Sequence, residues 1–476
     1  MTRSSSGDPS TAVDAREREE ASARAAARLR GREWPAPLLQ ALERIRRGGF
    51  QAWLVGGTVR DALLGREGGR QFDVATDLLP AEVSARFDRV EPIGLRHGTV
   101  LVLFEGIEIE CTTFRREGDY ADARHPDHVE FTRDPVADLA RRDLTGNAMA
   151  FDPASAVLLD PHGGALDLER GVLRAVGDPR ARFREDALRP LRVARLAAVL
   201  EMEPESGTRA ALGSALERAR QVAVERVRDE LDRMMLAPRP SVGFELLREA
   251  GLLPLWLPEL ARTWAVPQNR YHAYDVYLHS LYTCDAAPAD KLRVRWAALL
   301  HDIGKPDTRV ERGGEGTFYN HPFVGAELAD RLLERLRFPL EERRAIVHLV
   351  REHMFDFRPE WSDAGLRRWL RRVGEDAVAD LFDLRIADVL GNGLRQGFPV
   401  YLETMRRRIE RLLAESRALR VTDLAVDGRD VMRVLGIPPG PAVREALEAL
   451  LEEVLDDPAR NTRERLLARL EERRRA

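Results

Sequence analysis

The apolar pattern of this 476-residue chain changes once, near residue 180, and that change limits the folds open to it. Between about 35 and 175, short β-like runs such as QAWLVGG, TVLVLF and IEIECTTF alternate with helical stretches and with Gly, Pro and Asp breaks. From about 180 onwards, Leu and Ala recur at helical spacing among Arg and Glu, as in DALRPLRVARLAAVLEM. The sequence therefore predicts an α+β fold in which an α/β head is followed only by helices.

Local composition and Pro-containing breaks divide this plan into segments. Residues 1–32 hold hardly any large apolar side chain, so we expect a disordered tail there. We then expect a head over 33–175, a helical neck and body over 176–260, a second helical domain over 261–400 and a helical tail over 401–476. A chain of this length is long enough to hold several hydrophobic cores.

Cysteine usage and hydropathy exclude several classes of protein. Cys111 and Cys284 are the two cysteines of the sequence, and they form no CxxC spacing, so we expect neither a disulfide framework nor a zinc ribbon. No apolar run has the length of a membrane span, and the N-terminus lacks the apolar core of a signal peptide. We therefore predict a cytoplasmic protein without a membrane partner, and the sequence leaves its oligomeric state open.

A glycine pair followed by two strand-borne carboxylates marks a candidate nucleotide site. Gly56 and Gly57 stand between an apolar run and a helical stretch, and such a turn lets backbone amides approach a triphosphate, with Arg60 adding a charged donor. Asp73 and Glu110 lie in two further β-like runs. Phosphoryl transfer with metal ions needs carboxylates on adjacent strands, so we interpret this pair as catalytic and Asp73 as a Mg²⁺ ligand. Each motif alone is more typical of a plain turn or of a solvated side chain.

The consecutive motifs GGTVRDALLG, FDVATD, ECTTF, RRDLTGNA and RFREDALRPLRVAR resemble the class II tRNA nucleotidyltransferase (CCA-adding enzyme) and bacterial poly(A) polymerase family. The resemblance implies a polymerase-β-like, Mg²⁺-dependent nucleotidyltransferase head that adds C and A from CTP and ATP to tRNA 3′ ends without a template. A poly(A) polymerase acting on other RNA 3′ ends stays open as an alternative. The nucleotide-binding residues to which we assign this role are Gly56, Gly57, Arg60, Arg142, Asp143, Asn147, Asp186, Arg189, Arg192 and Arg195.

Asp186 and Arg189 carry a hypothesis for base selection. They are three residues apart in a helical stretch, so we expect both on one face of one helix, where an acceptor lies beside a fork of donors. Cytosine and adenine each present an amino donor beside a ring-nitrogen acceptor, whereas uracil and guanine present a carbonyl and an N–H. The pair therefore predicts selection of CTP and ATP. A simple salt bridge between the two residues is the alternative.

Gln71 departs from the family pattern, in which an Asp-x-Asp pair holds the metal. The sequence reads Gln71-Phe72-Asp73, and a neutral amide cannot balance the charge of Mg²⁺. Asp77 lies past the predicted strand end, while Glu110 could partly compensate. A catalytically impaired head that binds RNA for the second domain is therefore a further alternative.

Six of the ten histidines lie between residues 272 and 353, a density typical of metal binding or acid–base chemistry. The adjacent His301 and Asp302 can share one metal, and the segment RWAALLHDIGKPD resembles the HD phosphohydrolase superfamily. The resemblance implies a divalent transition metal or Mg²⁺ that lowers the pKa of bound water for hydrolysis of phosphate esters. The ligands that it implies are His279, His301, Asp302, His321, His353 and Asp388.

Related proteins with both domains hydrolyse phosphomonoesters and 2′,3′-cyclic phosphates, so the resemblance implies an HD activity on RNA ends or nucleotides. Lys305 follows the His-Asp pair, and we interpret it as a contact to a phosphate oxygen. In the tail, Arg406, Arg407 and Arg408 could contact RNA phosphates, although a solvated helix face is the more common role for such a run.

Overall fold

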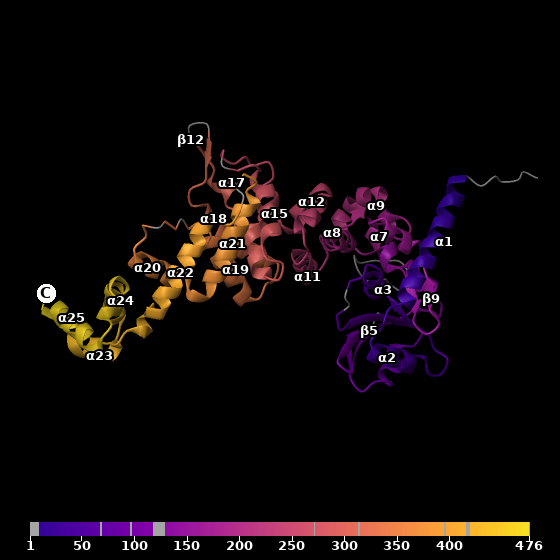
Figure 1. Cartoon of the computed structure of the whole chain (residues 1–476), viewed down its shortest axis with the longest axis horizontal. Coiled ribbons are helices and arrows are strands. Elements are labelled where there is room, and N and C mark those ends of the chain that lie inside the picture. Colours follow the sequence, from indigo (N-terminus) through magenta and orange to yellow (C-terminus); the bar gives the residue numbers. More distant parts are fainter. Residues whose placement is uncertain are drawn as a thin grey trace, which may run out of the picture. The chain divides into compact units, whose positions relative to one another are not determined.

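The computed structural model of the chain divides into two compact units, Met1–Trp256 and Leu257–Ala476 (Figure 1). The division falls close to the boundary that we expected between residues 260 and 261. The residues that the structure describes are 9–66, 69–95, 98–117, 129–270, 272–312, 315–355, 357–358, 360–394, 397–415 and 419–475.

The head is built on a seven-stranded sheet with the strand order β3-β4-β5-β2-β1-β8-β9. β2 and β5 run parallel, whereas the other neighbours are antiparallel. Buried and accessible positions alternate along β5, which is the pattern of a strand with one covered face. The strands are β1 (Ala52–Val55), β2 (Gln71–Thr76), β3 (Val90–Gly94), β4 (Thr99–Phe104), β5 (Ile107–Thr113), β8 (Ala150–Asp152) and β9 (Val157–Leu159).

Short helices flank this sheet and fill its apolar side. α2 contacts β1 and buries Leu38, Leu42 and Ile45. α3 begins directly after β1 and contacts both β1 and β2, so its first turn reaches the middle of the sheet. These elements are α2 (Ala36–Arg46), α3 (Gly56–Leu63), α4 (Pro80–Ser84), α5 (Pro135–Ala140) and the small strand pair β6 (Arg115–Glu117) and β7 (Val129–Phe131).

The prediction of a disordered tail over residues 1–32 is wrong for residues 9–30, which form helix α1 (Pro9–Arg30). Ala21, Ala25 and Leu29 recur every four residues and are buried, so small side chains give α1 a narrow apolar stripe. The helix contacts α6 (Gly164–Glu169), where Arg24 pairs with Glu169 at 2.7 Å. Composition suggested disorder because it measures total apolar content and misses such a stripe.

Helix α8 (Arg189–Leu200) is the centre of the neck and is buried along most of its length. It packs on α12 (Pro240–Glu249) and α11 (Val224–Met235). Gly243 permits this close packing, because a Cβ there would lie 2.9 Å from the Ala194 carbonyl oxygen. The remaining elements are β10 (Val172–Leu173), α7 (Pro179–Glu185), β11 (Glu203–Pro204), α9 (Ser206–Ala211), α10 (Leu216–Ala219) and α13 (Leu253–Trp256).

The second unit begins with a helical domain whose centre is α15, packed on both α16 and α21. Gly391 allows the contact between α15 and α21, since a Cβ on it would lie 2.5 Å from the Thr283 nitrogen. The strands β12 (Val310–Arg312) and β13 (Glu315–Thr317) pair here, which differs from the expected all-helical remainder. The helices are α14 (Pro258–Ala261), α15 (Val276–Ala286), α16 (Leu292–Leu300), α17 (Lys305–Thr308), α18 (His321–Arg335), α19 (Leu340–Glu352), α20 (Asp363–Val373) and α21 (Val378–Gly391).

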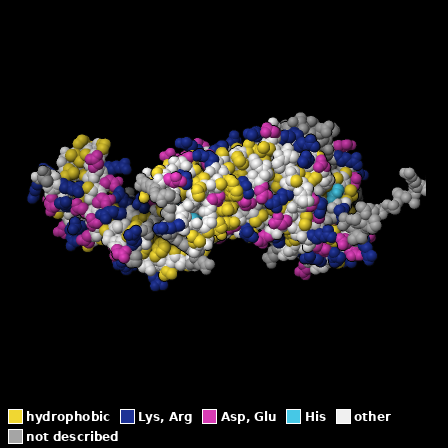
Figure 2. Space-filling view, turned by 90° about the horizontal axis from the view of Figure 1, so that it is seen from above, with side chains coloured by type: hydrophobic (Ala, Val, Ile, Leu, Met, Phe, Trp, Pro, Cys, Tyr) yellow, Lys and Arg dark blue, Asp and Glu magenta, His cyan; other side chains and the backbone are white. Residues whose placement is uncertain are grey.

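The tail consists of α22 (Val400–Glu415), α23 (Gly428–Leu435), α24 (Pro441–Asp456) and α25 (Arg463–Arg475). On α22, Arg406 and Arg407 pair with Glu403, while Arg408 pairs with Asp363 at 2.7 Å. Basic and acidic side chains are interspersed over the face seen in Figure 2. None of the helices in the described ranges has the length and apolar composition of a membrane span. The predicted α+β class, a mixed-sheet head before a mostly helical remainder, is confirmed.

Candidate active site and metal centre

A cavity of about 810 Å³ lies over the accessible side of the head sheet. β2, β5, the first turn of α3, the segment after α5 and the helices α8 and α11 contribute to its wall. It brings together every head and neck residue to which we assigned a role: Gly56, Gly57, Arg60, Asp73, Glu110, Arg142, Asp143, Asn147, Asp186, Arg189, Arg192 and Arg195.

Asp73 and Glu110 are partners across the parallel strands β2 and β5. The Gly57 amide donates to Asp73 Oδ2 at 2.9 Å, and the Asp73 amide donates to Thr58 Oγ1 at 2.7 Å. Burial raises the pKa of the Glu110 carboxyl, and the charge of Asp73 raises this pKa further. Two oxygen-bearing groups that repel each other in this way suit a hard divalent cation, which would neutralise both.

The glycine pair packs against Asp73. Gly56 has a φ of +61°, and a Cβ on it would lie 2.9 Å from Asp73 Oδ2 and 3.1 Å from an Arg142 nitrogen. A Cβ on Gly57 would lie 3.2 Å from the same carboxylate oxygen. The turn at Gly56 and Gly57, which we predicted to bind a triphosphate, therefore also lets the start of α3 pack against Asp73.

Hydrogen bonds and ion pairs hold the arginines of the cavity in fixed positions. Arg60 donates to Asn147 Oδ1 at 2.7 Å, and Asn147 donates to Asp143 Oδ1 at 3.0 Å. The Arg192 Nε donates to Asp143 Oδ2 at 2.9 Å. Burial acts to raise the pKa of Asp143, but the charge of Arg192 and the Asn147 hydrogen bond hold it well below its usual range. Asp143 is thus the anionic partner that holds Arg192 in place.

Asp186 and Arg189 do not share one helix, so this part of the prediction is wrong. Asp186 follows the last residue of α7, whereas Arg189 is the first residue of α8. Pro190 explains the break, because a proline inside a continuous helix would clash with the carbonyl of Asp186, four residues earlier. Both side chains nevertheless line the cavity.

The guanidinium of Arg189 is buried and fixed by backbone contacts. It donates to the carbonyl oxygens of Arg182 at 2.9 Å and Arg141 at 3.0 Å, and to Glu185 at 2.6 Å. Asp186 instead accepts from Arg226 at 3.2 Å. The two residues are therefore held by different partners and form no salt bridge with each other.

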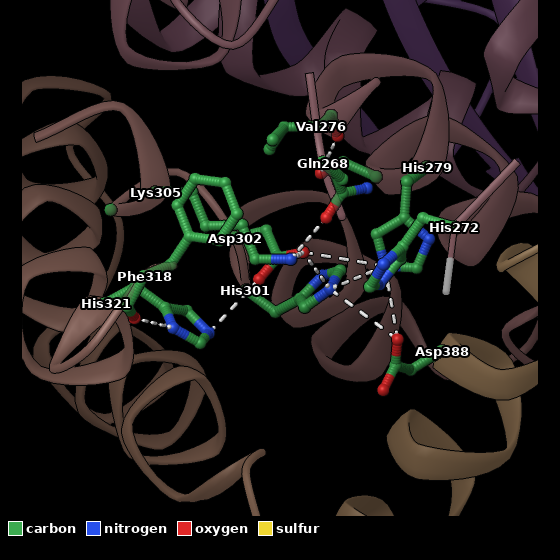
Figure 3. A network of polar contacts seen from close by, with 12 residues as sticks. Gln268, His272, Val276, His279, His301, Asp302, Lys305, Phe318, His321 and Asp388 are labelled. Atoms are coloured by element: carbon green, nitrogen blue, oxygen red, sulfur yellow. Dashed lines mark hydrogen bonds and ion pairs between the residues drawn. The ribbon is translucent and has the colours of Figure 1, made fainter. Parts of the chain in front are cut away.

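The second unit gathers the predicted HD residues around one centre (Figure 3). His279 Nε2 lies 3.2 Å from His301 Nε2 and 3.1 Å from Asp388 Oδ1. His301 Nε2 lies 3.1 Å from Asp302 Oδ2. α15, the end of α16 and α21 supply these four side chains, so the packing of three helices determines the arrangement.

Asp302 connects this group to a second one. Its Oδ1 lies 3.3 Å from His321 Nε2, which in turn lies 3.3 Å from His353 Nε2. His279, His301 and Asp302 form one candidate metal-binding group, and Asp302, His321 and His353 form the other. Asp302 belongs to both groups, so its carboxylate would be available to a metal held by either one.

Each histidine of the centre has its Nδ1 beside a backbone carbonyl oxygen. The carbonyls belong to Gly391 at 3.3 Å and to Ala298, Phe318 and Val350 at 2.7 Å each, for His279, His301, His321 and His353 respectively. A carbonyl can only accept, so each contact favours the tautomer with the proton on Nδ1, in which the Nε2 that faces the centre is the metal-binding nitrogen of the neutral ring. Four imidazole nitrogens and two carboxylates form a donor set that fits a divalent transition metal.

Lys305 lies within this centre, and its partners are now defined. Its Nζ lies 2.6 Å from Asp302 Oδ2 and donates to Gln268 at 2.6 Å. The sequence interpretation of a phosphate contact did not foresee Gln268, which no motif marked. In contrast, His348 points to the Val373 carbonyl oxygen at 2.7 Å and has a structural role.

Three families match parts of the chain. The family described as "Poly A polymerase head domain" matches residues 52–174, "Probable RNA and SrmB- binding site of polymerase A" matches 201–263, and "HD domain" matches 269–393. The CCA-adding enzyme of Geobacillus thermodenitrificans is 34% identical over 448 residues, which are 92% of this chain and 98% of that protein. This chain belongs to the CCA-adding enzyme family. It is therefore a nucleotidyltransferase with an added HD domain.

Other CCA-adding enzymes agree with this placement. That of Lactobacillus johnsonii is 41% identical over 418 residues, covering 88% of this chain and 92% of the relative. The structure of the Bacillus stearothermophilus CCA-adding enzyme in complex with CTP has a TM-score of 0.70 and 29% identity, covering 92% and 97% of the two chains. The Thermotoga maritima CCA-adding enzyme complexed with tRNA, at a TM-score of 0.55 and 18% identity, covers 93% and 97% and shares the fold. The poly(A) polymerase alternative is not favoured.

The sequence interpretation of this CCA-adding family member missed part of the cavity wall. Arg226 and Arg233 line it from α11, and one Arg226 nitrogen is buried without a hydrogen-bond partner among the described residues. The signal was present in ERVRDELDRMM, where Arg226, Glu230 and Arg233 recur at helical spacing.

Proposed function

We propose that the head adds C and A to the 3′ end of tRNA, taking CTP and ATP as substrates without a template. The observation that carries this proposal is the single cavity that joins the carboxylates Asp73 and Glu110 to a wall of arginines from the neck. It is supported by similarity to CCA-adding enzymes whose structures were solved with CTP and with tRNA.

The arginines of the cavity bind the triphosphate, and its carboxylates bind the metal ion. Arg60, Arg142 and Arg192 neutralise the triphosphate and hold it in one position, because their guanidinium groups are fixed by Asn147, Asp138 and Asp143. Asp73 and Glu110 hold Mg²⁺. When bound, Mg²⁺ supplies Lewis-acid stabilisation of the charge that develops on the phosphate.

Base selection belongs to Asp186 and Arg189. Arg189 is pre-oriented by its three contacts, so it presents a donor to the ring-nitrogen acceptor of C or A without loss of rotamer freedom. Asp186 accepts from the exocyclic amino group once Arg226 releases it. Uracil and guanine would place a carbonyl against the carboxylate and are rejected.

The test is incubation of the purified full chain with tRNA lacking its 3′ CCA, with Mg²⁺ and labelled CTP and ATP. We expect addition of C, C and A, followed by a stop. Asp73→Asn should abolish incorporation, while the exposed Asp88→Asn is the matched control. Continued A addition would indicate a poly(A) polymerase, and absence of incorporation by the wild type would indicate an impaired RNA-binding head.

A second activity is favoured by the HD centre, which we propose hydrolyses phosphate esters at RNA ends or in nucleotides. The four Nε2 atoms gathered beside two carboxylates support a divalent transition metal, with Mg²⁺ as the alternative. The metal would supply an activated water. Lys305 fixes Asp302, which both candidate groups share, and the backbone carbonyls fix the histidine rings.

His353→Gln and His348→Gln form a matched pair for this test, because only the first side chain faces the centre. We expect His353→Gln to lower the metal content, measured by mass spectrometry, and to slow hydrolysis of 2′,3′-cyclic AMP about 10- to 100-fold. His348→Gln should retain both. Equal metal content and rates in the two variants would contradict the proposal.

The neck over 176–260 and the tail over 401–476 are proposed to bind the RNA. Support comes from the match of residues 201–263 to an RNA-binding family. Arg406, Arg407 and Arg408 are engaged by carboxylates, so they contact phosphate only by exchanging partners. A cytoplasmic location is proposed as well, and it agrees with the two free, buried thiols of Cys111 and Cys284.

A further inference from the structure

Glu108 lies directly opposite Gln71 in the head sheet. The register of β2 and β5 pairs Gln71 with Glu108 and Asp73 with Glu110. Side chains alternate between the two faces of a strand, and partners in neighbouring strands share a face. All four side chains are therefore on the accessible face of the sheet, while Phe72 and Ile109 between them are buried on the other.

We propose that Glu108 supplies the metal-binding carboxylate that Gln71 cannot, so that Glu108, Asp73 and Glu110 together hold Mg²⁺ in the head. This inference rests on the proposed nucleotidyl transfer. The amide oxygen of Gln71 still serves as a neutral ligand. The negative charge that a divalent cation requires then comes from Glu108 on the neighbouring strand β5. The acidic pair of the family, placed along one strand, is thereby replaced by an acidic pair along the neighbouring strand.

The other nearby carboxylates are already engaged. Asp61 accepts two hydrogen bonds from Arg60, at 2.8 and 2.9 Å. Asp77 has only 4% of its side chain exposed and accepts from the Gln51 amide at 2.7 Å. Recruiting either one to a metal would break these contacts at a cost in stability.

Glu108 is different because its backbone is fixed and its side chain is available. Its amide donates to the Arg70 carbonyl oxygen at 2.7 Å, which anchors the strand start. Its carboxylate is exposed and has no hydrogen bond or ion pair within the described parts of the chain. Glu108 lies two residues before Glu110, just outside the residues that line the cavity, so its long side chain has to turn toward Asp73 when a cation binds.

The test replaces Mg²⁺ by Fe²⁺ in the full chain and maps the backbone cleavage that bound iron causes with ascorbate and hydrogen peroxide. Fragments ending on β2 and β5 report the head site, whereas fragments ending near His301 report the HD centre and serve as an internal control. The variants are Glu108→Gln, Gln71→Asp, the double variant Gln71→Asp/Glu108→Gln, and Glu91→Gln. Glu91 is an exposed carboxylate on the same sheet, two strands from β5.

We expect Glu108→Gln to need about tenfold more Fe²⁺ for half-maximal cleavage in the head, with unchanged cleavage at the HD centre. The double variant should recover head cleavage because the carboxylate returns to position 71, and Glu91→Gln should behave as the wild type. Head cleavage that is unaffected by Glu108→Gln, or no recovery in the double variant, would overturn the role of Glu108. Failure of the wild type to extend tRNA despite head cleavage would instead refute only the proposed transfer.

Discussion

Gly304 packs directly against the backbone of His321: a Cβ on residue 304 would lie 2.4 Å from the His321 carbonyl oxygen and 2.5 Å from the Gly325 nitrogen. This close approach brings the His301–Asp302 segment onto the first turn of α18. The bridge from Asp302 to His321 therefore depends on a residue without a side chain.

Gly304→Ala should consequently separate the two halves of the HD centre. We expect a loss of unfolding free energy of about 1–3 kcal/mol from the forced backbone shift, together with reduced metal content. Urea unfolding and elemental analysis measure the two effects. Gly440→Ala is the control, because a Cβ there has no atom within 4 Å. A variant with full metal content would show that the contact is not needed.

Asp186→Asn should weaken the choice of nucleotide. The side-chain amide of Asn would present an N–H donor to the exocyclic amino group of C or A, which is itself a donor. Discrimination for C and A over U and G should therefore fall by about 1–3 kcal/mol. Single-turnover incorporation of each nucleotide measures this, with the exposed Asp229→Asn on α11 as control. Unchanged preference would mean that Arg189 and the shape of the cavity select the base without Asp186.

These positions show what the sequence could and could not predict. Motif order predicted six candidate HD ligands and two head carboxylates, and the structure brings the first set around one centre and the second into one cavity. Such a prediction is possible because ligand chemistry restricts residue types strongly. The three-residue spacing of Asp186 and Arg189 predicts one helix, whereas Pro190 indicates the break that the structure shows between them. The position of Glu108 opposite Gln71 was not predictable, because the register between two strands that are distant in sequence decides which residues are partners.

Glu205 should make the neck sensitive to acid. Its carboxylate caps α9, accepting from the Thr208 amide at 2.9 Å, and backbone hydrogen bonds lower its pKa to about 2. Because folding lowers this pKa, the ionised carboxylate stabilises the folded protein at pH values above its ordinary pKa of 4.5. This stabilisation is lost as the pH falls toward 2. Glu205→Gln should therefore speed hydrogen exchange of the Thr208 amide at pH 7, with a smaller difference from wild type at pH 4. The exposed Glu203→Gln should show neither effect.

The buried apolar residues of α1 should hold this helix against the rest of the head, and one substitution tests this. Ala25 has 5% of its surface exposed, so Ala25→Glu would bury an unpaired charge against the rest of the head and release the helix. Limited proteolysis should then cut near residue 30, and cleavage should be faster than in the wild type. Ala27→Glu adds the same charge two residues away on the exposed side of α1 and should leave the cleavage rate unchanged. Equal rates in the two variants would show that α1 is held by its ion pairs, such as Arg24 with Glu169, and not by its apolar stripe.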